Sequence, residues 1–274
     1  MPGALSGSGT RSYTVADLGL AHVGGLTNFR SAFGSDTDFF KDKDWYISGY
    51  KGGGSSAQIF SAGSYQFLHF AFEMQAGDDV LAWAQEVINQ YPGLPTLIST
   101  HDYLNPAGER QPSAILDLAL GDPEGNNSAE QIWQKFISTN DQILMVFSGH
   151  QLGQATRVDE NIYGHKVYQM LSDYQERGQV AIDAGQPLQA NGNAMGVGDG
   201  WYRELTFQLG GETPSVSVKT YSSHYEIYSN ALDSYADWYK SVEQPTFTDK
   251  EFYEADDFTI ELDDFYLRFG LPDE

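Results

Sequence analysis

Cysteine is missing altogether from this sequence of 274 residues. Its absence excludes disulfide-bonded scaffolds, zinc sites built from thiolates, and cysteine nucleophiles. It does not identify a cellular compartment, because both secreted and cytosolic proteins can do without cysteine.

Basic residues are scarce, with 15 Lys and Arg against 38 Asp and Glu and a formal net charge of −23. This balance argues against a partner that is duplex nucleic acid or an anionic membrane surface, since both require a basic face. Hydrophobic residues make up 41% of the chain, which is not the profile of a disordered acidic protein. The acidic surface is typical of a protein soluble in high salt, or of one with a cation-gathering site.

Long apolar runs are also lacking. No run reaches the roughly 18 residues that a membrane-spanning helix needs, so we expect no membrane segment. Residues 1–12 carry no apolar stretch after a basic one, so no signal peptide is expected and the compartment stays unknown.

The first two thirds of the chain alternate between strand and helix signals. The order strand, helix, strand, helix, strand predicts an α/β fold with parallel pairing and right-handed crossovers. Asp78 and Asp79 are expected as a helix N-cap, and Ser128 with Gln131 as a capping box. The predicted elements are strands at Gln66–Phe72, Thr96–Thr100 and Ile143–Phe147, and helices from Asp78 to Tyr91 and from Ser128 onward.

The remainder is dominated by alternating strand patterns and turn signals. Strands are predicted at Lys166–Leu171, Trp201–Leu209 and Val216–Tyr221. Residues 225–274 are aromatic and acidic, and we interpret them as an appended edge strand or wrap.

Two histidines, His101 and His150, follow predicted parallel strands. Ligands bind at the carboxyl edge of an open α/β sheet, because the loops converge there. Imidazole nitrogens suit zinc, manganese, iron or nickel, so the pair is a candidate metal site. A histidine after a strand also commonly serves as a hydrogen-bonded core or loop residue.

The segments around these histidines resemble the calcineurin-like metallophosphoesterases, in particular the bacterial branch. Leu97–Leu104 resembles the family's fourth motif, and Asp141–His150 resembles its fifth. The resemblance covers roughly residues 28 to 222 and extends through the spacer segments Gly77–Ala84, Val167–Tyr174 and Gly198–Leu205.

This resemblance implies a two-layered β-sandwich flanked by helices, with two metals at its strand ends. In such enzymes the metals activate a bridging hydroxide for attack on a phosphate ester. His101 and His150 match two ligands of one of the metals.

The chain also departs from the family pattern. The fifth motif has a second histidine where this chain has Leu152, and the first two motifs have no counterpart. We therefore expect a domain truncated at its N-terminal side, with an incomplete site that holds one metal or none. Near the third motif, His22 is either a remnant of a catalytic position or an ordinary loop residue. Asp102, Asp173 and His22, with Asn105 behind them, are the candidates to complete a rebuilt site.

Other chemistry-bearing residues have plainer interpretations. His69 lies inside a predicted strand and is expected to be a satisfied core residue. No Gly-x-Ser-x-Gly elbow is present, so a serine nucleophile of the α/β-hydrolase type is not indicated. The 17 Tyr and 5 Trp could line a sugar-binding face, although core and rim positions are the commoner use.

The functional prediction is a metal-dependent hydrolase that acts on phosphate mono- or diesters, or on activated esters. Two alternatives stay open: an inactive binding or structural remnant of the fold, and a carboxylesterase without metal that reuses the cleft. The expected partners are a small-molecule ester and further copies of the chain, joined through exposed sheet edges.

The predicted catalytic residues are His22 and Asp102, and the predicted metal ligands are His101, His150 and Asp173. The expected organisation is a lead-in at residues 1–27, the phosphoesterase-like domain at 28–224 and an extension at 225–274.

Overall fold

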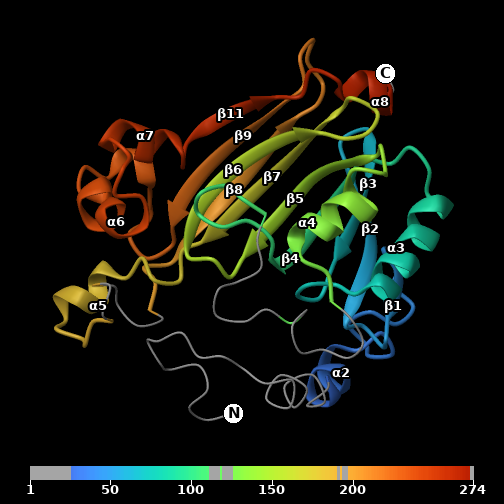
Figure 1. The fold of residues 1–274 in the computed structure, drawn as a ribbon, viewed down its shortest axis with the longest axis horizontal. Coiled ribbons are helices and arrows are strands. Elements are labelled where there is room, and N and C mark those ends of the chain that lie inside the picture. The colour runs from blue at the N-terminus through green and yellow to red at the C-terminus, as the bar shows by residue number, and fades with distance from the viewer. Residues whose placement is uncertain (1–25, 111–117, 119–125, 190–191, 193–196, 272–274) are drawn as a thin grey trace. The chain divides into compact units, whose positions relative to one another are not determined.

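The structure is a computed structural model that describes residues 26–110, 118, 126–189, 192 and 197–271. It is a mixed α/β protein in which helices flank a large mixed sheet (Figure 1). This sheet has seven strands in the order β1-β2-β3-β4-β5-β7-β6. The strands are β1 Tyr46–Tyr50, β2 Ser55–Ala62, β3 Tyr65–Ala71, β4 Thr96–Asp102, β5 Ile143–Gly149, β6 Gly153–Glu160 and β7 Lys166–Asp173.

A second sheet has the order β10-β9-β11, and β8 also pairs with β9. Its strands are β8 Trp201–Gln208, β9 Ser215–Ser222, β10 Ile227–Tyr228 and β11 Phe258–Glu261. The described helical segments are α2 Thr27–Phe33, α3 Asp78–Gln90, α4 Ala129–Ile132, η2 Trp133–Ile137, α5 Gln179–Asp183, η3 Ser229–Ala231, α6 Tyr235–Glu243, α7 Asp249–Glu254 and α8 Phe265–Phe269. In the described part of the chain, no helix is both long enough and apolar enough to cross a membrane.

The chain divides into two compact units. The second unit holds the chain from within β7 onward, together with two shorter segments from earlier in the sequence. The first unit comprises the residues up to Tyr103, Arg110–Phe147 and Asp159–Tyr168, and the second comprises Leu104–Glu109, Ser148–Val158 and Gln169–Glu274.

The first unit contains the predicted strand–helix–strand motif. β3 pairs in parallel with β4, and α3 connects them, which confirms the predicted parallel pairing for these two strands. Two strands that the sequence analysis did not predict, β1 and β2, extend the sheet in antiparallel pairing. α3 buries Val80, Leu81, Ala84, Val87 and Ile88.

The two predicted helix starts have different outcomes. The capping box at Ser128 is confirmed, because its Oγ accepts from the Gln131 N–H at 3.3 Å and the Gln131 side chain accepts from the Ser128 N–H at 2.9 Å. The prediction of aspartates at the cap of α3 is wrong, because Gly77 occupies that position. Asp78 and Asp79 instead lie in the first turn, where their charge is favourable beside the positive helix end.

Aromatic side chains fill the space between the sheet of the first unit and its helices. The ring of Phe70 on β3 lies 5.9 Å from Trp83 on α3 and 6.1 Å from Phe136 in η2. Phe72 contacts Phe136 at 5.7 Å. These contacts place α3 and η2 on one face of β3, and leave the opposite face for other side chains.

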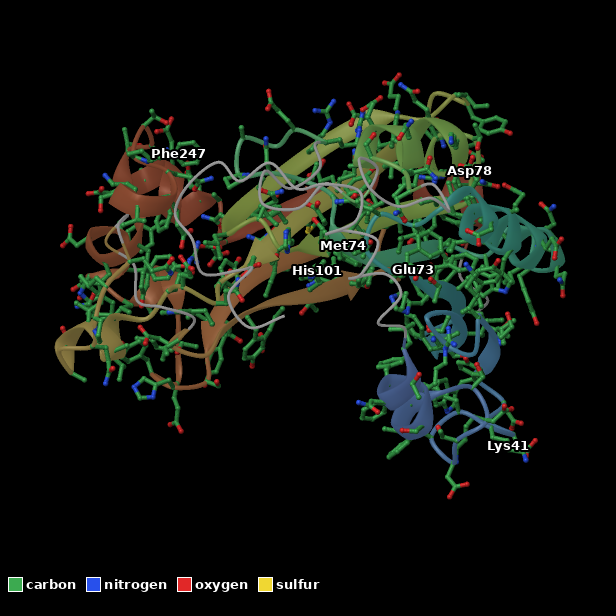
Figure 2. All side chains as sticks on the ribbon, turned by 60° about the horizontal axis from the view of Figure 1, so that its bottom comes forward. Lys41, Glu73, Met74, Asp78, His101 and Phe247 are labelled. Carbon is green, nitrogen blue, oxygen red and sulfur yellow. The ribbon has the colours of Figure 1, made fainter. Side chains whose placement is uncertain are left out.

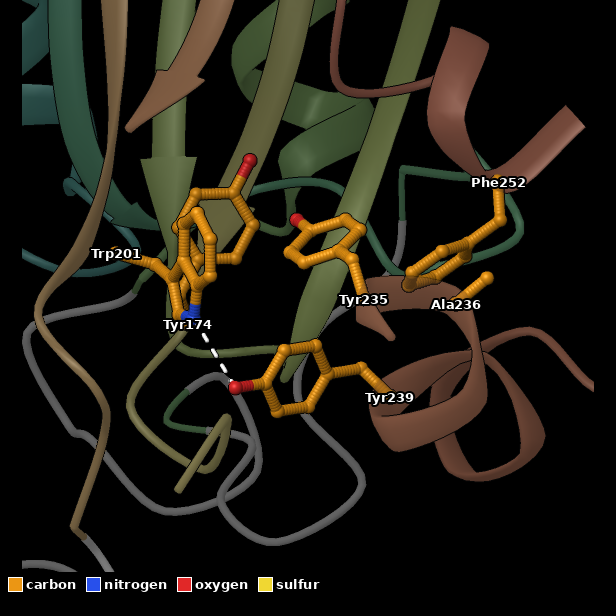
Figure 3. Packing of buried hydrophobic residues seen from close by; sticks show 6 residues of the cluster. All are labelled: Tyr174, Trp201, Tyr235, Ala236, Tyr239 and Phe252. Carbon is orange, nitrogen blue, oxygen red and sulfur yellow. Dashed lines mark hydrogen bonds between the residues drawn. The ribbon is translucent and has the colours of Figure 1, made fainter. Parts of the chain in front are cut away.

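The second unit has an aromatic core of its own (Figure 3). It joins Tyr174, which follows β7, and Trp201 of β8 to the helices α6 and α7. The indole N–H of Trp201 donates to the Tyr239 hydroxyl at 3.2 Å. The edge strand predicted within residues 225–274 is present as β11, which pairs antiparallel with β9. The core residues are Tyr174, Trp201, Tyr235, Ala236, Tyr239 and Phe252.

Candidate functional site

His101 is the penultimate residue of β4, and its side chain is exposed (Figure 2). The sequence predicts His101 just past the strand, but β4 continues to Asp102. Its position near the carboxyl end of a strand in parallel pairing is the one expected of a ligand-binding edge.

Asp102 follows His101 but points to the other face of β4, because successive side chains of a strand alternate. It is only 1% exposed, and its Oδ2 accepts from the Gln75 side-chain amide at 3.1 Å. Oε1 of the same Gln75 side chain accepts from the Leu118 N–H at 2.9 Å. Asp102 therefore anchors the loop after β3, and it does not share a site with His101.

The predicted site residues of the second unit lie at the end of a strand or in a turn. His150 directly follows β5, as predicted, and has a left-handed backbone with φ of +65°. Asp173 ends β7, and its Oδ1 accepts from the Gln175 N–H at 3.3 Å. Asn105 accepts from the backbone of Ala107 at 3.0 Å, which identifies a side-chain-stabilised turn. His22 lies outside the described residues.

A catalytic zinc site needs three protein ligands held together. Among the described residues, no group of three or more His, Asp or Glu side chains is arranged to hold a metal ion. The alternation of His101 and Asp102 across β4 is one physical reason. The described residues thus do not fit the metal centre that the resemblance implies.

A row of polar side chains crosses the first unit on the sheet face opposite α3. His69 on β3 lies between its direct partner on β2, Gln58, and Ser99 on β4. The distance from His69 Nδ1 to Gln58 Oε1 is 3.0 Å, and from His69 Nε2 to Ser99 Oγ it is 2.9 Å. Gln58 Nε2 in turn donates to Ser56 Oγ at 2.7 Å. All four side chains are half-buried.

This row is the feature that sequence reasoning missed. His69 does have the hydrogen-bond partners expected of a satisfied residue, but one of them is a serine hydroxyl. Burial lowers the pKa of His69 from the ordinary value of 6.5, so its imidazole is neutral at pH 7. The parallel register could have revealed the pair: His69 lies opposite Leu97, so Ser99 is the next residue of β4 on that face.

The second unit carries a mostly apolar cavity of about 330 Å³. None of the predicted site residues lines it. Its wall combines the loop at Pro106–Gly108, two residues of β6, residues that follow α6, the end of α7 and the first residue of β11. Buried carboxylates of this unit have other roles: Asp199 accepts from the Gln179 N–H at 2.6 Å, and Asp256 accepts from Arg177 at 3.0 Å.

Comparison with known proteins finds a distant relative but no matching family model. No protein-family model matches the sequence. The chain is 27% identical over 177 residues to the uncharacterized protein YvnB of Bacillus subtilis strain 168. The match covers 61% of this chain and 12% of that protein, so the chain resembles a small part of a much longer relative.

Proposed function

We propose that this chain has the calcineurin-like sandwich fold and hydrolyses an ester bond of a small molecule. The bond is that of a phosphate mono- or diester or of an activated carboxylic ester. The observation that carries the proposal is the exposed His101 at the carboxyl end of β4, within the parallel β3–α3–β4 unit. Ligands bind at this edge of such sheets, and the flanking segment Leu97–Leu104 resembles a phosphoesterase motif.

The resemblance to the phosphoesterases implies a divalent metal cofactor (zinc, manganese, iron or nickel). The described residues do not supply three grouped ligands for such a metal. Metal dependence is therefore an arm of the experiment. Association of copies through sheet edges is likewise a proposal, which light scattering of the purified chain tests.

The experiment uses three p-nitrophenyl substrates: the phosphate, the bis-phosphate diester and the acetate. Each is assayed with added Mn²⁺ or Zn²⁺, and with EDTA. We expect hydrolysis of at least one ester, reduced by about 100-fold in His101→Ala. The matched control is His224→Ala, another exposed histidine, which lies in the second unit.

Activity lost in EDTA and restored by one cation supports the metal-dependent form of the proposal. Activity that persists in EDTA supports hydrolysis without metal. No turnover of any of the three esters under any condition overturns the proposed function.

A binding or structural module without catalysis is the second candidate. The observation in its favour concerns Asp102, the residue after His101. Its carboxylate is buried and hydrogen-bonded to Gln75, so it has a structural role and not the predicted catalytic one. Complete absence of turnover in the same assays supports this candidate.

A further inference from the structure

The polar row on the first unit's sheet has a fixed direction of hydrogen bonding. Gln58 uses its amide N–H to donate to Ser56 Oγ, so its Oε1 is the atom that faces His69 Nδ1. An amide oxygen only accepts, so the proton of the neutral imidazole lies on Nδ1. His69 Nε2 then has a lone pair and accepts from the Ser99 hydroxyl at 2.9 Å.

The same arrangement leaves His69 ready to take a proton. Burial disfavours the charged imidazolium, so the pKa of His69 is lowered and the ring is in its basic form at neutral pH. Ser99 is partly exposed, so solvent reaches part of this residue. A serine bonded to a neutral imidazole whose other nitrogen is held by an acceptor is the arrangement used for nucleophilic catalysis.

We propose that Ser99 is the nucleophile of an acyl-ester hydrolase, with His69 as its general base and Gln58 as a positioning residue. This proposal rests on the ester hydrolysis proposed above and names its substrate class and residues. Neither the hydroxyl nor the neutral ring carries a positive charge to hold a phosphate. An uncharged carboxylic ester is therefore the substrate that this constellation suits.

In the acylation step Ser99 Oγ attacks the ester carbonyl carbon, and its proton passes to His69 Nε2. Collapse of the tetrahedral intermediate breaks the bond to the alkoxy oxygen, which leaves as the alcohol with the proton from His69. In the deacylation step water attacks the acyl-serine and gives a proton to His69. Collapse then releases the carboxylic acid and returns the proton to Ser99 Oγ. The sum is one ester and one water converted to one acid and one alcohol.

His101 gains a role in this scheme that needs no metal. It lies two residues beyond Ser99, on the same face of β4 and about 7 Å further along the strand. Its side chain is exposed, and in this scheme it stabilises the negative charge that develops on the carbonyl oxygen of an ester bound over Ser99.

The test is covalent labelling with a fluorophosphonate probe, read by peptide mass spectrometry. The probe reacts with activated serines and needs no turnover. We expect the label on Ser99 in the unmodified chain, no label at that peptide in Ser99→Ala, and labelling slowed by about 100-fold or more in His69→Gln. Ser61→Ala, which removes an exposed hydroxyl of β2 in the same unit, is the matched control and should label normally.

Hydrolysis of p-nitrophenyl acetate by the same variants, each checked for cooperative unfolding, gives the second readout. Ester turnover that is unchanged in Ser99→Ala, with no label on Ser99, overturns this inference and leaves the proposed ester hydrolysis standing. Absence of turnover of every ester overturns the proposed function. In that case the label, or its absence, on Ser99 in the unmodified chain still decides whether this serine is activated.

Discussion

Arg177 and Asp256 form an ion pair of 3.0 Å in which neither side chain has any solvent exposure. The pair ties the chain after β7 to the residues before β11. Arg177 also binds both carboxylate oxygens of Glu243 at 2.7 Å, and Arg203 reaches Asp256 at 3.2 Å. The aromatic rings of Tyr174 and Phe252 lie within cation–π distance of the Arg177 guanidinium. Charge and aromatic packing thus stabilise the second unit together.

Removal of the buried carboxylate should destabilise the protein strongly. We expect Asp256→Asn to lower the free energy of unfolding by about 3–5 kcal/mol, because it leaves buried guanidinium charge without its partner. Urea unfolding followed by circular dichroism measures this change. The control is Glu254→Gln, whose exposed pair with Lys250 at 3.2 Å should contribute less than about 1 kcal/mol. Equal effects of the two substitutions would contradict the structural role of Asp256.

The same carboxylate predicts acid sensitivity. Burial alone would raise the pKa of Asp256, but the guanidinium groups of Arg177 and Arg203 hold it below the ordinary value of 3.8. A carboxylate with a lowered pKa in the folded state stabilises the protein above its unfolded pKa, and this contribution is lost as the pH falls through the folded pKa. We expect the free energy of unfolding to fall on acidification below about pH 4, and less steeply in Asp256→Asn. Parallel curves for the two proteins would rule the effect out.

Asp199 should stabilise the turn that precedes α5. Its carboxylate accepts from the N–H groups of Gln179 and Val180, and from the hydroxyls of Tyr225 and Tyr239. We expect Asp199→Asn to cost about 2–3 kcal/mol, because hydrogen bonds to a buried charge are among the stronger ones. Chemical denaturation measures the cost. Asp183→Asn, an exposed neighbour that accepts from the Gln179 side chain, should change stability by less than about 0.5 kcal/mol.

The aromatic core of the first unit should respond as a close-packed interior. Phe136 is 1% exposed and contacts the rings of Phe70 and Phe72. Phe136→Ala should cost about 3–5 kcal/mol, from lost burial and the cavity left behind. Phe39→Ala removes a ring that is 61% exposed, so a thermal melt should barely change. A comparable loss of stability in both variants would show that Phe136 is not a core residue.

Gln58 should act through the basicity of His69. Because burial lowers the pKa of His69, the acid limb of kcat/KM for p-nitrophenyl acetate should lie below pH 6.5. Gln58→Glu places a negative charge beside the ring, favours the imidazolium, and should move that limb to higher pH. Gln90→Glu, on the exposed side of α3, should leave the profile unchanged. An unmoved limb in Gln58→Glu would show that Gln58 does not position His69.

The spacing of apolar residues in the sequence predicted the bounds of the buried strands and of the long helix well. β3, α3, β4 and β5 lie within a few residues of their predicted bounds, because each buries most of its apolar side chains. β1, β2 and β6 were not predicted. β6 is largely polar and half of the residues of β2 are polar, and both form strands because neighbouring strands supply the pairing hydrogen bonds.

For the candidate site, too, the sequence predicted some features and the tertiary structure decided others. The sequence by itself determined that no thiol chemistry is available, that the surface is acidic, and that His101 lies near the end of a parallel strand. Only the tertiary structure decided that Asp102 faces away from His101, and that Ser99 lies within hydrogen-bond distance of His69. The physical reason is that a strand alternates its side chains and a sheet joins residues distant in sequence, so register decides which polar groups meet.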